Sequence, residues 1–217
     1  MDIDTTVKGI PVTIADMERT ITEILDIEID DYVSFRIKKV SEIMDEAEYP
    51  GIRFSMDALL DGAVTPLKID ISTGDEITPR EISYSYQLMF EDRSISIMTY
   101  PIETVLAEKL ETFISRSTTN TRMRDLYDIH LLLESQKIDY DTLAFALERT
   151  AKKRGSFKLL ANAENVLKAV ESSDNMKKMW DVYRKSYHYA SEYTWEDVLY
   201  SVRKLSIKAK LEVLGED

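Results

Sequence analysis

Two aspartates near the start of the sequence are placed so that they could bind a metal ion. Asp2 and Asp4 alternate with Ile3. In an extended strand both carboxylates lie on one face, about 7 Å apart, while Ile3 points to the opposite face. Two unpaired carboxylates at this separation repel each other, and a hard cation such as Mg²⁺ or Mn²⁺ between them relieves the repulsion. The alternative interpretation is an exposed, frayed chain end.

A third carboxylate, Asp70, lies in a segment with a strand pattern. Residues 67–72 alternate between aliphatic and polar side chains, which places Lys68 and Asp70 on the same polar face. Asp70 could complete a metal site with Asp2 and Asp4, or accept a proton from an attacking hydroxyl. A simple Lys68–Asp70 pair on a polar outer face explains the pattern equally well.

Lys109 interrupts the apolar stripe of a predicted helix over 102–116, so its ammonium needs a partner. The next predicted helix, over 121–135, is apolar almost all round except for one polar arc that holds Arg124, Asp125 and Asp128. Consecutive helices joined by a short segment pack antiparallel, which could bring Lys109 towards Asp125 or Asp128. Two simpler explanations stay open: Lys109 reaches solvent along its own stem, or Arg124 and Asp128 form a structural i, i+4 pair.

The elements that must position these residues follow from periodicity. A helix is expected to start at Thr13, and half-buried antiparallel strands are expected around 33–37, 52–56 and 67–71, with further strands near 85–90 and 94–98. Six helices are expected near 102–116, 121–135, 140–153, 161–171, 174–189 and 195–211. Strands followed by helices predict an α+β fold with a mixed or antiparallel sheet. We expect a sheet domain over residues 1–99 and a helical domain over 100–217.

The amino-acid composition excludes some kinds of chemistry and some kinds of binding partner. Lys+Arg 28 against Asp+Glu 40 gives a net charge of −12, which argues against tight non-specific binding of nucleic acid by the whole surface. The absence of Cys excludes thiol chemistry and thiolate metal sites and fits a reducing, cytoplasmic setting. No apolar run is long enough to cross a membrane. The cation-rich stretch 149–158 is either a solvated helix end or a local contact for RNA.

Four short motifs occur in an order that resembles a known family. The segments 67–70 (LKID), 105–110 (VLAEKL) and 124–128 (RDLYD), together with the D-x-D of Asp2 and Asp4, are similar to motifs of the AbiEii/AbiGii toxin nucleotidyltransferases. These proteins belong to the DNA polymerase β-like nucleotidyltransferase superfamily. The resemblance covers roughly residues 1–135, and it implies a nucleotidyltransferase-like sheet part followed by helices.

The resemblance also implies a role for each candidate residue. Asp2 and Asp4 would hold Mg²⁺ or Mn²⁺ and the nucleoside triphosphate, and Asp70 would complete the acidic cluster or activate the acceptor hydroxyl. Lys109 would contact the triphosphate. Arg124 would be a further nucleotide-binding residue, and Asp125 and Asp128 would orient Lys109. We expect folding to gather these groups around one cation-filled cleft.

The implied activity is that of a toxin in an AbiE-like toxin–antitoxin or phage-defence system. It would transfer a nucleoside monophosphate from a nucleoside triphosphate, GTP being one candidate, to an RNA such as a tRNA or to a protein, and it would have a cognate antitoxin protein. In the family, a small-residue turn that grips the triphosphate precedes D-x-D. This sequence begins at D-x-D, so we expect an amino-terminally truncated member. Two alternatives follow: a catalytically inactive remnant acting only as a binding module, or a nucleotidyltransferase that modifies small molecules such as antibiotics.

Overall fold

The computed structural model describes residues 2–10, 12–43 and 51–211. The chain divides into two compact units, residues 1–75 and 76–217, which we call the sheet unit and the helical unit. The arrangement of strands followed by helices confirms the predicted α+β class. The predicted domain boundary at residues 99 and 100 stays a prediction. The compact units divide 24 residues earlier, because the last two strands group with the helices.

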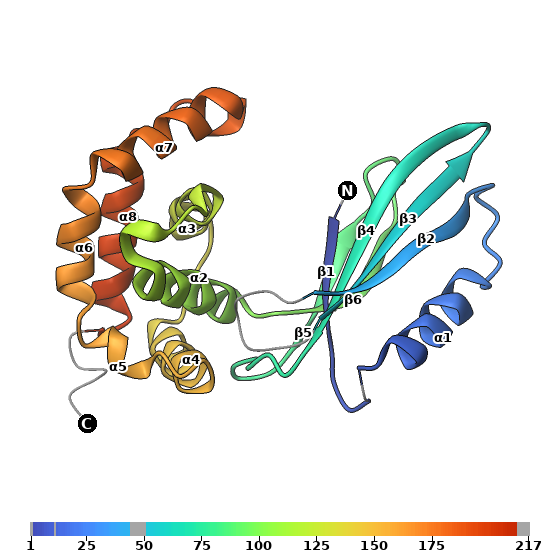
Figure 1. The fold of residues 1–217 in the computed structure, drawn as a ribbon, viewed down its shortest axis with the longest axis horizontal. Coiled ribbons are helices and arrows are strands. Elements are labelled where there is room, and N and C mark those ends of the chain that lie inside the picture. Colours follow the sequence, from blue (N-terminus) through green and yellow to red (C-terminus); the bar gives the residue numbers. More distant parts are fainter. Residues whose placement is uncertain (1, 11, 44–50, 212–217) are drawn as a thin grey trace. The chain divides into compact units, whose positions relative to one another are not determined.

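The sheet unit is a four-stranded mixed sheet with one helix. Its strands have the spatial order β1-β4-β3-β2 (Figure 1), with β1 parallel to β4 and the other neighbours antiparallel. In chain order the elements are β1 (Asp2–Val7), α1 (Ile14–Leu25), β2 (Ser34–Ile43), β3 (Gly51–Leu60) and β4 (Ala63–Thr73). The predicted strands around 33–37, 52–56 and 67–71 are therefore confirmed, and each is longer than its periodic core.

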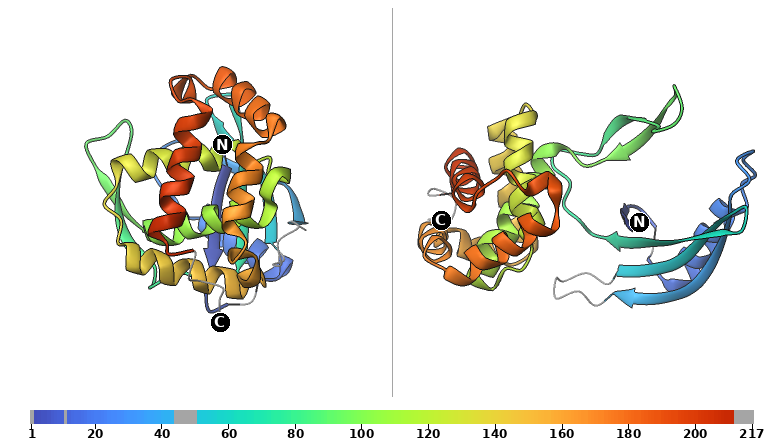
Figure 2. Two further views of the ribbon diagram at one scale, coloured as in Figure 1. Left: turned by 90° about the vertical axis from the view of Figure 1, so that its left-hand side faces the viewer. Right: turned by 90° about the horizontal axis from the view of Figure 1, so that it is seen from above.

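Helix α1 covers the apolar face of this sheet, as Figure 2 shows from above. Thr13 caps the helix, as predicted, by accepting a hydrogen bond from the backbone N–H of Asp16 at 3.1 Å. Met17 and Ile21 of α1 pack against Phe54 and its aliphatic neighbours in the sheet. Because strand side chains alternate, the polar residues of β1, β3 and β4 are left together on the other face.

The helical unit begins with a two-stranded antiparallel hairpin, β5 (Ile82–Gln87) and β6 (Ser94–Thr99). The predicted strand at 85–90 was placed three residues too late. The chain leaves the ladder at Leu88, whose backbone N–H instead bonds to the carbonyl of Arg93 across the turn. Hydrophobic periodicity does not locate such a turn, because Leu88, Met89 and Phe90 are apolar but lie outside the strand.

All six predicted helices are present in the helical unit. They are α2 (Ile102–Arg116), α3 (Met123–Ser135), α4 (Tyr140–Lys153), α6 (Ala163–Glu171), α7 (Asp174–Ser186) and α8 (Trp195–Lys208). The prediction missed the short α5 (Phe157–Leu160), and it extended α7 into a separate 3₁₀ turn, η2 (His188–Ala190). A second 3₁₀ turn, η1 (Ser117–Thr119), links α2 to α3.

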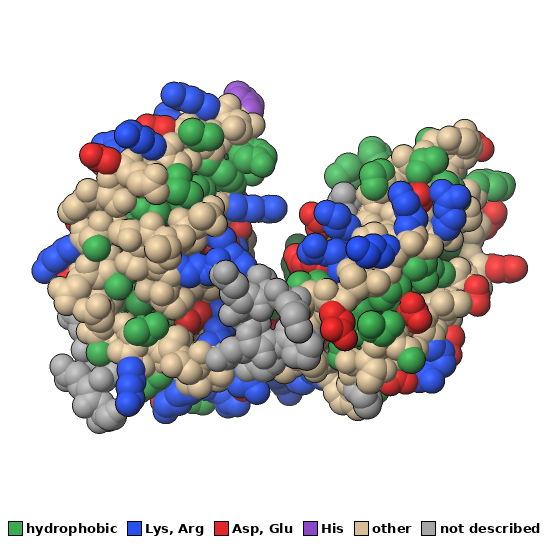
Figure 3. Space-filling model, in the orientation of Figure 1, with side chains coloured by type: hydrophobic (Ala, Val, Ile, Leu, Met, Phe, Trp, Pro, Cys, Tyr) green, Lys and Arg blue, Asp and Glu red, His purple; other side chains and the backbone are tan. Residues whose placement is uncertain are grey.

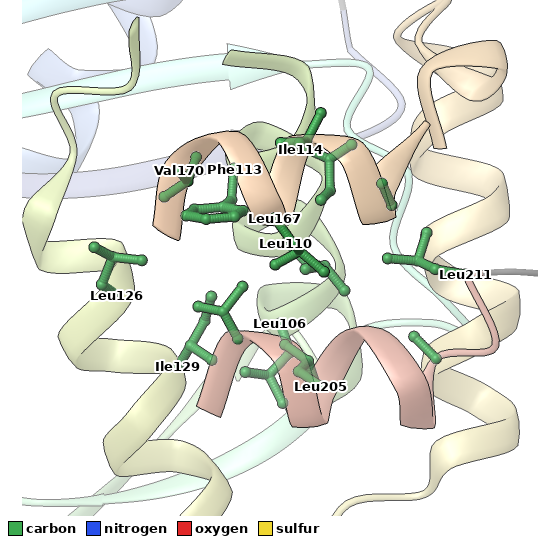
Figure 4. Packing of buried hydrophobic residues seen from close by; sticks show 14 of the residues in the cluster. Leu106, Leu110, Phe113, Ile114, Leu126, Ile129, Leu167, Val170, Leu205 and Leu211 are labelled. Carbon is green, nitrogen blue, oxygen red and sulfur yellow. The ribbon is translucent and has the colours of Figure 1, made fainter. Parts of the chain in front are cut away.

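The core of the helical unit is built around α2. Leu106, Leu110 and Phe113 of α2 are buried, and Figure 4 shows them among side chains from the surrounding helices. Leu126 and Ile129 of α3 join the same cluster. These contacts hold α2 and α3 next to each other, so polar side chains that share the edge of both helices are also held together. Among the residues that the structure describes, none of the helices has the length and apolar character needed to span a bilayer.

Candidate functional site

The ammonium of Lys109 lies between two carboxylates of the neighbouring helix. Its Nζ donates to Oδ1 of Asp125 at 2.7 Å and to Oδ2 of Asp128 at 2.8 Å. All three side chains are mostly buried, with exposed fractions of 20% for Lys109, 16% for Asp125 and 24% for Asp128. The contacts bear out the expected approach of Lys109 to these aspartates. Lys109 does not simply extend into solvent, since it has two partners within hydrogen-bond distance.

The electrostatics of this triad keep Lys109 charged. Burial by itself lowers the pKa of the Lys109 ammonium, but the hydrogen bonds and charges of Asp125 and then Asp128 outweigh it, so the pKa is raised. A protonated lysine has three N–H donors, and the two aspartates use two of them. The third N–H can therefore be offered to an anionic ligand without breaking either contact.

Arg124 has a looser position. Its Nε lies 4.0 Å from Oδ2 of Asp128, and its side chain is 78% exposed. An exposed pair at this distance contributes little to stability. The guanidinium is therefore free to exchange Asp128 for a ligand.

The strand register of the sheet unit brings the three predicted metal-binding carboxylates onto one face. In the parallel pair of β1 and β4, Asp4 lies opposite Asp70 and Asp2 lies opposite Lys68. Paired residues in a sheet point to the same side. The prediction from alternating side chains, which separated these residues from the aliphatic face, is thus correct. The pairing of β1 with β4 further shows that Asp4 and Asp70 are direct neighbours.

Arg53 of β3 is a member of this face that sequence reasoning missed. It lies opposite Asp70 in the β3–β4 register, and its Nε and Nη2 donate to the two oxygens of Asp70 at 2.7 and 2.5 Å. The pKa of Arg53 is raised, chiefly by these hydrogen bonds, then by the charge of Asp70, and to a smaller extent by the charges of Asp2 and Asp4. The alternation over 52–56 places Arg53 on the polar face, so that pattern was the available signal.

The donor types on this face suit a hard divalent cation, but the side chains as placed do not form a complete set of ligands. Within residues 2–10, 12–43 and 51–211, no three acidic or histidine side chains converge closely enough to hold a metal ion. Asp70 faces Arg53, while Asp2 and Asp4 are exposed. The arrangement therefore fits a metal held by Asp2 and Asp4, with Asp70 as the neighbouring carboxylate that could join them.

The cation-rich stretch 149–158 is engaged in ion pairs within the helical unit. Arg149 pairs with Glu76, Lys152 pairs with Glu148, and Arg154 pairs with Glu108 and Glu111. Glu111 is buried, and it also accepts a hydrogen bond from Ser156 at 2.6 Å. Arg154 therefore stabilises the fold through a buried carboxylate, whereas Arg149 and Lys152 are about half exposed, so a contact between this stretch and RNA stays a prediction.

This assignment gives a prediction about stability. Replacing Arg154 with Ala leaves the buried carboxylate of Glu111 without its cation, so the free energy of unfolding should fall by about 2–4 kcal/mol. Urea denaturation followed by circular dichroism measures the change. Lys152→Ala is the matched control, because its side chain is 58% exposed and its pair with Glu148 is worth only about 0.3–0.5 kcal/mol. Equal effects of the two substitutions would show that the Arg154–Glu111 contact is not structural.

Comparison of the chain with known proteins identifies the family to which it is similar. The chain matches the family described as nucleotidyl transferase AbiEii toxin, type IV toxin–antitoxin system, over residues 1–201. A crystal structure from H. pylori described as that of a proposed nucleotidyltransferase is 18% identical with a TM-score of 0.39, covering 99% of this chain and 79% of that chain. The crystal structure of JHP933 from Helicobacter pylori is 18% identical with a TM-score of 0.40, covering 99% and 76%. A comparison with curated proteins gives no match. Since the family match spans most of the chain, including the D-x-D, Asp70 and the Lys109 triad, the protein belongs to the AbiEii family of nucleotidyltransferase toxins.

Proposed function

We propose that this nucleotidyltransferase transfers a nucleoside monophosphate from a nucleoside triphosphate to an RNA acceptor, with Mg²⁺ or Mn²⁺ as its cofactor. Family membership supplies the reaction class, a nucleotide substrate and an antitoxin partner, and members of the family generally use a divalent metal. We further propose GTP as a candidate nucleotide and a tRNA end as a candidate acceptor. Action in phage defence and a cytoplasmic location are also parts of the proposal.

The observation that carries this proposal is the position of Lys109. Its ammonium is kept charged, lies within 2.7–2.8 Å of two carboxylates, and has one N–H left to donate. Fixed cations that face a phosphate stabilise the negative charge that develops during phosphoryl transfer, and they cost no reorganisation when they are held in place beforehand. In the proposed reaction, Lys109 donates to an oxygen of the triphosphate. Asp125 and Asp128 hold it in place, and Arg124 is an additional contact for the nucleotide.

The sheet unit supplies the proposed metal ligands and an acceptor-activating group. Asp2 and Asp4 present carboxylate oxygens, which Mg²⁺ prefers. When bound, the metal neutralises charge on the phosphate oxygens. Asp70 either becomes a third ligand or accepts the proton of the attacking hydroxyl, through lone pairs that Arg53 does not use. The guanidinium of Arg53 holds the carboxylate of Asp70 in position for either role.

A transfer assay tests the proposal. The chain is incubated with total RNA and each of the four α-³²P-labelled nucleoside triphosphates, and products are separated on denaturing gels. We expect label in RNA with one or more nucleotides in the presence of Mg²⁺ or Mn²⁺, and none when EDTA is added. The absence of labelled RNA or protein with all four nucleotides and both metals would contradict the proposal. Labelling of a small molecule instead, together with protection of growth on an antibiotic, would favour the small-molecule alternative.

A further inference from the structure

One end of the helical unit carries a cluster of tyrosine rings that the site described above does not use. Tyr127 of α3 contacts Tyr189 at a centroid distance of 4.8 Å and Tyr193 at 5.9 Å. Tyr183 of α7 contacts Tyr187 at 4.7 Å, and Tyr187 contacts Tyr189 at 5.5 Å. We call these five residues the tyrosine cluster. The hydroxyls of Tyr183 and Tyr189 are 2.9 Å apart and hydrogen-bonded, so the exposed rings have a fixed arrangement.

Core packing explains only part of this cluster. Tyr127, Tyr183 and Tyr193 are half-buried and pack on the hydrophobic core of the helical unit. Tyr187 and Tyr189, by contrast, are each 46% exposed. They lie at the junction of α7 and η2, where Tyr187 ends the helix and Tyr189 is in the middle of the 3₁₀ turn. These two half-exposed aromatic rings, which are inclined by 33° to each other, form an aromatic surface that is available to a ligand.

A pocket of about 550 Å³ lies on the same segment of the chain as these two tyrosines. It is lined by residues of α7 and η2, namely Asp181, Arg184, Lys185, Ser186, His188 and Ser191. Ser186 immediately precedes Tyr187, and His188 separates it from Tyr189 in the chain, while the tyrosines themselves do not line the pocket. Figure 3 shows a histidine at this end of α7, with hydrophobic side chains beside it and Lys and Arg side chains over the helix.

The pocket has the composition of an anion site. Arg184 and Lys185 provide two cations against the single carboxylate of Asp181, and the imidazole of His188 also lines the pocket. Arg184 is held in position, because its Nη2 donates to the carbonyl of Ser191 at 2.9 Å. The ammonium of Lys185 is exposed, and within the part of the chain that the structure describes it has no carboxylate at ion-pair distance.

The tyrosine cluster also reaches the Lys109 triad. Tyr127 precedes Asp128 on α3, and its ring contacts Tyr189. On α7, the pKa of Tyr183 is raised by burial first, then by the hydrogen bond and charge of Tyr189, and then by the charge of Asp128. The segment from α7 to η2 therefore carries both the cationic pocket and tyrosine rings that lie close to Asp128 of the triad.

We propose that this surface binds the unpaired end of the RNA acceptor, with bases stacked on Tyr187 and Tyr189 and a backbone phosphate in the pocket of Arg184, Lys185 and His188. This inference rests on the proposed function, in which RNA is the acceptor. Proteins that bind single-stranded nucleic acid combine aromatic rings, on which bases stack, with cations that follow the backbone. The net charge of −12 disfavours nucleic acid over the surface as a whole, so an RNA end has to be held at a local site of this kind.

Binding of a labelled single-stranded RNA tests the site directly. Fluorescence anisotropy is measured with an eight-nucleotide single-stranded RNA and with a blunt RNA duplex as the comparison. We expect Tyr187→Ala to weaken binding of the single strand about tenfold, which is the loss of one stacked base, while Tyr187→Phe keeps it. Lys185→Ala should weaken binding. It should also reduce the slope of the logarithm of the binding constant against the logarithm of the salt concentration by the amount that corresponds to about one lost phosphate contact. Tyr200→Ala is the matched control, since Tyr200 is 68% exposed on α8, outside the tyrosine cluster.

The outcomes separate this inference from the proposed function. Unchanged binding by Tyr187→Ala and Lys185→Ala would overturn the RNA site, whether or not the wild type transfers nucleotides. Loss of binding in these variants would support the site even if the wild type showed no transfer. In an active enzyme, Tyr187→Ala should raise KM for the RNA and leave KM for the nucleotide unchanged. If a polyglutamate peptide bound as tightly as the RNA, and the tyrosine substitutions had no effect on the RNA, the surface would belong to an acidic protein partner and the inference would be wrong.

Discussion

Lys109→Ala is expected to lower kcat for nucleotidyl transfer by a factor of about 10²–10³, the effect of removing one preorganised donor to a developing negative charge. The lysine is held by Asp125 and Asp128 before any substrate binds, so its whole contribution is available in the transition state. The measurement is steady-state transfer of α-³²P-labelled nucleoside monophosphate to RNA. Lys109→Arg should recover only part of the activity, because the guanidinium cannot reproduce a compact ammonium between two carboxylates.

A loss of activity in Lys109→Ala has to be separated from a loss of stability. Removing the ammonium leaves Asp125 and Asp128 facing each other in a mostly buried position, and should lower the free energy of unfolding by about 1–3 kcal/mol. The triple variant Lys109→Met, Asp125→Asn, Asp128→Asn removes all three charges and should regain much of this stability without regaining activity. Activity of that triple variant near the wild-type level would show that Lys109 has only a structural role.

The pH dependence of this contribution has a definite sign. Because the folded-state pKa of Lys109 lies above the unfolded value of 10.5, the ammonium stabilises the fold at every pH below that value. The stabilisation is lost as pH rises through the higher folded-state pKa. The difference in stability between the wild type and Lys109→Ala should therefore be constant through neutral pH and shrink only in strongly alkaline solution.

The second large effect is expected at the D-x-D. The double substitution Asp2→Asn, Asp4→Asn should lower transfer by a factor of about 10³ or more, because the amides carry no charge and bind Mg²⁺ far more weakly than carboxylates do. Both side chains are exposed, and Asp4 lies opposite Asp70 in the parallel ladder, so neither substitution removes a contact of the hydrophobic core. Transfer is measured over a range of Mg²⁺ and Mn²⁺ concentrations, together with Mn²⁺ binding followed by electron paramagnetic resonance.

Asp61→Asn is the matched control for this experiment. Asp61 is exposed in the turn between β3 and β4 and has a φ of 47°, a left-handed conformation that Asn adopts as readily as Asp. Its replacement should change neither transfer nor Mn²⁺ binding. If Asp2→Asn, Asp4→Asn binds Mn²⁺ and transfers nucleotide as well as Asp61→Asn does, the metal ligands lie elsewhere in the chain.

Sequence patterns located the candidate site better than they described its contacts. The helical spacing of 102–116 marked Lys109 as a cation within an apolar stripe, and the polar arc of the next helix gave Asp125 and Asp128 as its partners; the distances confirm both. The same method missed Arg53, which covers Asp70, and the contact of Arg154 with the buried Glu111, although it was right that most cations of 149–158 are exposed. In each of these cases the partner comes from a separate element, and local periodicity carries no information about which element that is.

The sequence by itself located strands β2, β3 and β4 and the six longer helices of the helical unit, and it predicted which face their side chains occupy, because alternation and the 3.6-residue period are properties of the local backbone. It thereby separated Asp2, Asp4 and Asp70 from the apolar face and placed Lys109 towards the core. Only the tertiary structure decided that β1 runs parallel beside β4, that Arg53 binds Asp70, and that tyrosines of α3, α7 and η2 contact one another. These contacts depend on how segments that are distant in the sequence pair and pack. The free energy of that packing is a sum over the whole fold, so local sequence patterns do not contain it.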